Sequence, residues 1–258
     1  MAINEPYIPK EFLALQINYC KQQLAELPEV KISKRTIHGE TKEVYVVNSH
    51  IYSVNCNNSI RLKEYSNKRE ELTCELSRLE GLWYSKFTCL PPEDIAPHKV
   101  ERRLFINPAN SVMLNGAFFD SLKNDADPNH RESKTFFYNG TYYRSSSEVE
   151  IARYYTENGI PFKYEPEIWL NGLNYPIYTD FVILIKALDL CKFHEHIGMK
   201  NAANYNRTTA TKYINYSGAG LLPELDIFYT YDIPGVPFDL RTLPIKLNGV
   251  IHSSLFLP

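Results

Sequence analysis

Two apolar runs, each with one acidic residue, stand close together in YPIYTDFVILIKALDLCKFHEHIGM (residues 175–199). Their β-branched and aromatic residues predict two successive β-strands, at residues 175–185 and 190–199. Asp180 comes directly before FVILI, and Glu195 stands within KFHEHIGM. A carboxylate in an apolar strand is costly unless it is paired or bound to a metal. These two acids are therefore the first candidates for functional residues.

The sequence on either side of this stretch extends the pattern. An Asn-Gly step between aromatic runs predicts a hairpin over residues 135–144. Residues 145–159 predict a helix, because Ser145 and Glu148 fit a capping box and Gly159 fits its end. The other predicted elements are a strand at residues 161–170, a helix at 201–216 and a strand at 224–232. The order α-β-β-β-α-β predicts an α/β or α+β fold, with a mixed sheet flanked by helices.

The first half of the chain reads as an accessory region of helices and a hairpin. Apolar residues at helical spacing indicate a helix over residues 10–27, and residues 42–54 alternate like a hairpin. Residues 59–87 combine mixed charge with regularly spaced leucines, which indicates one long helix or two joined helices. Residues 91–133 are irregular and rich in turn-forming residues, so we expect a linker or ordered loops.

Length and composition favour a globular protein. With 258 residues the chain can form one large or two small domains, and we divide it into an α/β accessory region (1–133) and a core domain (134–258). No apolar run approaches the ~20 residues that span a bilayer, and no signal segment is evident, so we expect a cytoplasmic protein without membrane association. The five cysteines form no CxxC, which predicts no structural zinc. A net charge of −2 neither favours nor excludes a nucleic-acid partner.

Three acids occur in a helix–strand–strand order that suits a metal site. Glu148 falls in the first turn of its predicted helix, whereas Asp180 and Glu195 fall on successive predicted strands. Acids placed in this way can face one cleft and bind a hard divalent cation such as Mg²⁺. Phosphodiester hydrolysis would explain such a site, because one or two cations can activate water and neutralise charge as the P–O bond breaks.

These residues resemble the motifs of the PD-(D/E)XK nuclease superfamily, which has a restriction-endonuclease-like fold. RSSSEVEIA (residues 144–152) resembles the first motif, with Glu148 as its acid, and YTDF (residues 178–181) resembles the second, with Asp180. HEHIGM is similar to the E-x-x-G variant of the third motif. The resemblance implies that Asp180, Glu195 and the backbone carbonyl of His196 ligate the metal, and that Glu148 reaches it through a water.

The chain departs from the superfamily pattern at two positions. The proline before the motif aspartate is replaced by Thr179, and the lysine two residues after Glu195 is replaced by Ile197. In this superfamily the lysine can move to the following helix, where Lys212 is our candidate, with Lys200 behind it. Lys212 could also be an ordinary solvated helix lysine. Strand alternation points the His196 side chain to the face opposite the motif acid.

Each of the three acids also has a structural explanation. Glu148 could only stabilise the helix start, and Asp180 could accept hydrogen bonds from backbone amides at a strand end. Glu195 could form a salt bridge with Lys192 or His194. The joint helix–strand–strand order, rather than any one acid, therefore carries the metal-site hypothesis.

Nearby charged residues leave further alternatives open. Arg144 could contact a phosphate group of nucleic acid, or it could pair with Glu148 or Glu150. Glu165 and Glu167, on the strand predicted at residues 161–170, could support the site or be exposed.

The sequence therefore predicts a Mg²⁺- or Mn²⁺-dependent endonuclease that hydrolyses DNA phosphodiester bonds. RNA is the rival substrate. The rival to an enzyme is a catalytically inactive nuclease-like module, which would bind nucleic acid or a protein partner in a defence or mobile-element system. The accessory region could contact a partner protein, and pairing of two copies as a homodimer is left open.

Overall fold

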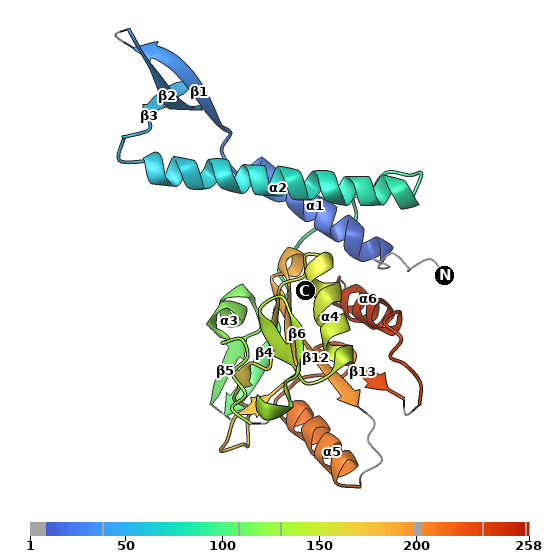
Figure 1. Ribbon diagram of the computed structural model, residues 1–258. Helices are drawn as coiled ribbons and strands as arrows, with labels where there is room; N and C mark the ends of the chain where they lie inside the picture. Colours follow the sequence, from blue (N-terminus) through green and yellow to red (C-terminus); the bar gives the residue numbers. More distant parts are fainter. Residues whose placement is uncertain are drawn as a thin grey trace. The chain divides into compact units, whose positions relative to one another are not determined.

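Two compact units make up the chain in the computed structural model (Figure 1). One consists of Leu13–Pro97, and the other of His98–Pro258 with the residues before Leu13. The structure describes residues 9–37, 39–107, 109–129, 131–198, 203–233, 235–255 and 257. Within these residues no helix is both long enough and apolar enough to cross a membrane.

The Leu13–Pro97 unit contains two helices and a small antiparallel sheet. Its elements are α1 (Lys10–Glu26), β1 (Val30–Ile37), β2 (Glu40–Val47), β3 (His50–Ser53) and α2 (Ser59–Lys86). The strand order is β1-β2-β3, and Asn48 and Ser49 turn between β2 and β3 with positive φ. Val30, Tyr45 and Leu62 form a buried cluster. The predicted first helix and hairpin are confirmed, and residues 59–87 form one long helix.

The second unit begins earlier than the sequence predicted. Residues 91–133 are not simply a linker, because they contain β4 (Arg103–Asn107), β5 (Asn110–Met113), α3 (Gly116–Ser121) and the 3₁₀ turn η1 (Arg131–Ser133). The amide of Val100 donates to the carbonyl of Leu188, and the Arg102 guanidinium pairs with Asp226. The structure thus groups residues 98–133 with the core, whereas the sequence suggested a division after residue 133.

The rest of the second unit forms the mixed α/β arrangement that carries the predicted acids. The elements are β6 (Phe136–Tyr138), β7 (Thr141–Tyr143), α4 (Ser146–Glu157), β8 (Phe162–Tyr164), β9 (Glu167–Ile168), β10 (Ile177–Tyr178), β11 (Phe181–Ile185), η2 (Lys186–Leu188), β12 (Leu190–Gly198), α5 (Ala203–Gly218), β13 (Ile227–Asp232) and α6 (Thr242–Leu255). The predicted hairpin is β6–β7, with Asn139 and Gly140 at positive φ in its turn. The helix α6 was not predicted.

The central sheet has four strands in the order β13-β12-β11-β8. β12 and β13 run parallel, and the other neighbours run antiparallel, so the sheet is mixed as expected. Two predicted strands are each divided into two shorter ones. Glu165, at φ 41°, separates β8 from β9, and Thr179 with Asp180 separates β10 from β11. β9 and β10 pair with each other in a separate two-stranded sheet.

Helices cover both faces of the central sheet. On β12, His194 contacts Tyr155 of α4, whereas the next residue, Glu195, contacts Lys212 of α5. Successive strand side chains point to opposite faces, so α4 and α5 lie on opposite faces of the sheet. Figure 1 shows this arrangement around β12 and β13, and α6 packs against β13. The β11 and β12 side chains are almost completely buried, as expected for a sheet covered on both faces.

Candidate functional site

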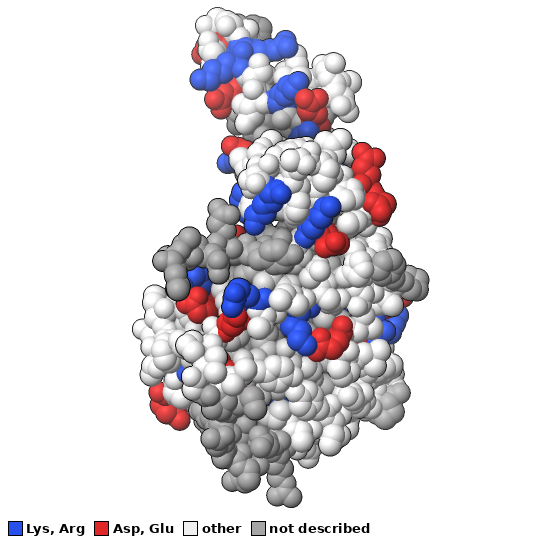
Figure 2. All heavy atoms as spheres, turned by 90° about the vertical axis from the view of Figure 1, so that its right-hand side faces the viewer, with Lys and Arg blue, Asp and Glu red and all other residues white. Residues whose placement is uncertain are grey.

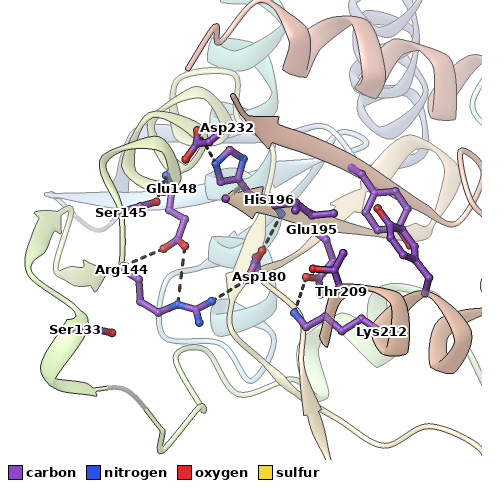
Figure 3. Close-up of a pocket in the computed structure, with 14 residues that line it drawn as sticks. Ser133, Arg144, Ser145, Glu148, Asp180, Glu195, His196, Thr209, Lys212 and Asp232 are labelled. Atoms are coloured by element: carbon purple, nitrogen blue, oxygen red, sulfur yellow. Dashed lines mark hydrogen bonds and ion pairs between the residues drawn. The ribbon is translucent and has the colours of Figure 1, made fainter. Parts of the chain in front are cut away.

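The second unit contains a pocket of about 590 Å³ that is lined by residues of the central sheet, of the first turn of α4 and of α5. All six residues singled out in the sequence contribute to its lining: Arg144, Glu148, Asp180, Glu195, His196 and Lys212. Figure 3 shows that the labelled side chains of this set converge on one region from the N-terminal end of α4, the strands and α5. The sequence therefore identified residues that lie together in space.

Glu148 is held by the start of α4. Ser145 is the N-cap residue, and its hydroxyl accepts a hydrogen bond from the Glu148 amide at 3.2 Å. The Glu148 carboxylate does not return a bond to the cap residue; it accepts from the Arg144 amide at 2.9 Å and from the Tyr164 hydroxyl at 2.8 Å. Burial, with 6% of Glu148 exposed, and repulsion from Asp180 raise its pKa to about 7. Only half of the predicted capping box is formed, and the carboxylate is directed into the pocket.

Asp180 lies at the bend between β10 and β11, with only 4% of its surface exposed. Its Oδ1 accepts a hydrogen bond from Arg144 Nη2 at 2.9 Å, and its Oδ2 accepts from the His196 backbone amide at 2.7 Å (Figure 3). The bond from the His196 amide is the kind of backbone hydrogen bond that a purely structural role of Asp180 would require. The bond to Arg144, however, places a charged partner inside the pocket.

Glu195 lies in the middle of β12 with 3% of its surface exposed. Lys212 Nζ donates to its Oε2 at 2.6 Å, and the Tyr216 hydroxyl donates to its Oε1. Burial raises the pKa of Glu195, Lys212 opposes this shift, and Asp180 adds to it. The salt bridges that could have explained Glu195 are not formed, because Lys192 donates to the Leu225 carbonyl and His194 points to the other face. Thus Asp180 and Glu195 line the same pocket, and Asp180 is near enough to raise the pKa of Glu195.

Lys212 comes from α5, seventeen residues after Glu195 in the sequence. Although burial opposes its charge, Glu195 and Asp180 raise the pKa of Lys212, so it remains a cation at neutral pH. Lys212 and Tyr216 lie four residues apart, on one side of the helix, and both bond to the Glu195 carboxylate. Lys200, the other lysine considered, lies outside the described residues.

Arg144 links the acids to one another. Its guanidinium contacts Asp180 and also lies 2.7 Å from Glu165 Oε1, a distance that makes an ion pair although the hydrogen-bond geometry is poor. Glu165 is fully buried and also pairs with Lys134. Glu150, an alternative partner for Arg144, instead pairs with Arg153. Of the two acids weighed on the predicted strand, Glu165 therefore supports the site.

A polar network on the α4 face was not foreseen in the sequence. His194 and His196 both bond to the Thr230 hydroxyl at 2.8 Å. Asp232 lies 3.2 Å from His196 Nε2 and accepts a hydrogen bond from the Ser147 hydroxyl. The His196 side chain is therefore directed away from Glu195, as strand alternation predicted. A signal for this network was present in β13, where the polar residues Thr230 and Asp232 alternate along the strand and so project from the same face of the sheet as His196.

The oxygen atoms that could hold a hard cation come partly from side chains and partly from the backbone. Among the residues that the structure describes, no three His, Cys, Asp or Glu side chains are grouped as a metal site. Asp180 and Glu195 supply carboxylates, and the amide of His196 points at Asp180. Because the N–H and C=O groups of a strand residue point to the same edge, the His196 carbonyl also faces Asp180. Two acids and one carbonyl form a suitable oxygen donor set for Mg²⁺ or Mn²⁺.

Comparison of the chain with protein-family models, with curated protein sequences and with solved structures found no match. The chemistry of the pocket therefore follows from its own residues. Those residues combine buried carboxylates with two cations, Arg144 and Lys212, which pair with them.

Proposed function

We propose that the second unit is a divalent-metal-dependent endonuclease that hydrolyses phosphodiester bonds in DNA. The observation that carries this proposal is that Asp180, Glu195 and Lys212 line one pocket, with Lys212 Nζ 2.6 Å from Glu195. The helices beside the pocket and the strands of the central sheet, α4, β8, β11, β12, α5 and β13, follow the α-β-β-β-α-β order predicted from the sequence pattern. The lysine absent at Ile197 has a replacement in contact with the motif acid.

The cation would be held by Asp180, Glu195 and the His196 carbonyl. Mg²⁺ or Mn²⁺ bound there would supply neutralisation of phosphate charge and a lower pKa for water. Lys212 keeps a positive charge beside Glu195, where it stabilises negative charge that develops on the phosphate group.

Glu148 is suited to accept a proton in this reaction. Its Oε2 is occupied by Arg144 and Tyr164, while its Oε1 lies 3.9 Å from the Arg144 guanidinium. A carboxylate with a pKa of about 7 matches the pH at which a general base works best. We assign to Glu148 Oε1 the task of orienting the attacking water and receiving its proton.

Arg144 has the geometry to orient a phosphodiester. Two of its nitrogens face Glu165 and Asp180, and a guanidinium has five N–H donors in total. The remaining donors are free to bind phosphate, consistent with the nucleic-acid contact predicted for this residue. On the face shown in Figure 2, basic and acidic side chains are interspersed among the coloured residues rather than gathered in one basic patch.

Cleavage of DNA tests the proposal directly. Plasmid and linear DNA are incubated with Mg²⁺ and with wild-type protein, Asp180→Asn or Glu195→Gln. Each substitution keeps the side-chain shape and removes one carboxylate, so we expect a loss of at least about 100-fold in rate. Glu167→Gln is the matched control, because Glu167 is an exposed acid on β9 outside the pocket. Cleavage by both pocket variants at the wild-type rate would remove these acids from the mechanism.

The second candidate is a nuclease-like module without catalytic activity. It is favoured by one observation: both oxygens of Asp180 and both oxygens of Glu195 already have hydrogen-bond partners within the protein. The hydrogen bonds of these two carboxylates are thus satisfied without a cation. Calorimetric titration with Mn²⁺ separates the two candidates, because heat of binding that disappears in Asp180→Asn supports the metal enzyme. Parallel assays with deoxy and ribo substrates of one sequence distinguish DNA from RNA as the substrate.

A further inference from the structure

Tyr229 carries a buried hydroxyl group that has no partner among the residues that the structure describes. The residue lies on β13, lines the pocket and has 4% of its surface exposed. Its Oη is shielded from solvent and makes no hydrogen bond to any described part of the chain. Buried polar atoms are nearly always hydrogen-bonded, so an exception beside a candidate active site calls for an explanation.

The position of Tyr229 is fixed by the sheet and by α5. In the parallel pairing of β12 and β13, Tyr229 lies directly opposite Glu195, so both side chains project from the same face. The Tyr229 ring also packs against Tyr213 of α5, with ring centroids 4.6 Å apart, and Tyr213 lines the pocket as well. The phenol therefore stands in the pocket wall next to the acid of the third motif.

A purely structural role does not explain why this residue is a tyrosine. A phenylalanine would fill the same space and pack on Tyr213 without burying an unpaired hydroxyl. The comparison with Tyr216 is informative, because that neighbouring buried tyrosine does have a partner in Glu195. Burial and then repulsion from Glu195 raise the pKa of Tyr229, so the phenol keeps its proton and is available as a donor.

We propose that Tyr229 Oη, which is closed to solvent in this structure, turns toward a phosphodiester bound in the pocket and donates a hydrogen bond to one of its non-bridging oxygens. This inference rests on the proposed function for the identity of the substrate. The acceptor is an anionic oxygen because the proposed substrate is a phosphodiester, for which Lys212 and Arg144 of the same lining supply cationic partners. Tyr229 is thus assigned as a substrate-binding residue that is unpaired until the substrate arrives.

The test removes only the hydroxyl. Tyr229→Phe is compared with the wild type in three measurements: DNA cleavage with Mg²⁺, binding of inorganic phosphate, and unfolding by urea. The control is Tyr231→Phe, which makes the same change two residues later on β13 at an exposed side chain outside the pocket lining. We expect Tyr229→Phe to weaken phosphate binding and slow cleavage by about 10- to 100-fold, as for a lost hydrogen bond to a charged acceptor. Its resistance to urea should be unchanged or higher.

The outcomes separate this inference from the proposed function. Wild-type phosphate affinity and cleavage in Tyr229→Phe would overturn the role of Tyr229, while the nuclease would stand. A clear loss of urea resistance in Tyr229→Phe would also overturn it, because the hydroxyl would then have a structural partner. If the wild type does not cleave DNA, the nuclease proposal fails, and the phosphate titration still decides whether Tyr229 binds an anion.

Discussion

Glu148→Gln should remove a pH dependence from the stability of the second unit. Burial and repulsion from Asp180 raise the pKa of Glu148 to about 7 in the folded protein, against an ordinary value of 4.5. Between these values the folded state binds a proton that the unfolded state releases. Stability contributed by this proton is therefore present below about pH 4.5 and is lost as the pH rises through about 7. Glutamine has no such proton to lose.

The size of the effect follows from the two pKa values. Their difference, 7 − 4.5, multiplied by about 1.36 kcal/mol per pH unit, gives about 3 kcal/mol. No allowance for solvent screening is needed, since only 6% of Glu148 is exposed. Relative to the wild type, Glu148→Gln should gain about 2–3 kcal/mol between about pH 5 and about pH 8.

Urea unfolding at several pH values measures this gain. The free energy of unfolding is compared for the wild type, Glu148→Gln and Glu157→Gln, the last being an exposed acid on the same helix. The wild type and Glu157→Gln should lose stability in parallel as the pH rises, while Glu148→Gln should diverge from both. Three parallel curves would show that Glu148 has an ordinary pKa, and would remove the argument for it as a general base.

Two other substitutions test the contacts that position the site. Arg102→Met leaves the buried Asp226 without its cation and should lower the free energy of unfolding by about 3–5 kcal/mol. The control, Arg103→Met, changes an exposed neighbour and should cost less than about 0.5 kcal/mol. Equal losses in the two variants would refute the importance of the Arg102–Asp226 pair. Ser145→Ala removes the N-cap of α4 and should cost about 1 kcal/mol in the same measurement, and no loss of stability would show that the cap bond to the Glu148 amide is unimportant.

Local signals in the sequence were sufficient for several elements. The Asn139-Gly140 step specifies the β6–β7 turn because both residues take positive φ. Ser145 specifies the start of α4 because its hydroxyl caps the helix. In these places neighbouring residues determine the structure, so no knowledge of distant contacts was needed.

Long-range contacts decided what the sequence could not show. The predicted strand over residues 161–170 breaks at Glu165, whose left-handed backbone conformation accompanies its burial against Arg144 and Lys134. The region around Arg102 looks irregular because its short strands are stabilised by partners far along the chain, such as Asp226. Propensity and periodicity carry no information about such partners.

The lysine of the site shows how the two kinds of information combine. The sequence offered Lys212 as the lysine of the proposed site, without deciding which side of α5 faces the sheet. The structure places Lys212 and Tyr216, four residues apart, against the same carboxylate of Glu195. Lys212 and Tyr216 each bond to one oxygen of the Glu195 carboxylate, so Lys212 is not an ordinary solvated lysine of the helix surface. Lys212, on α5, is therefore the cationic partner of Glu195.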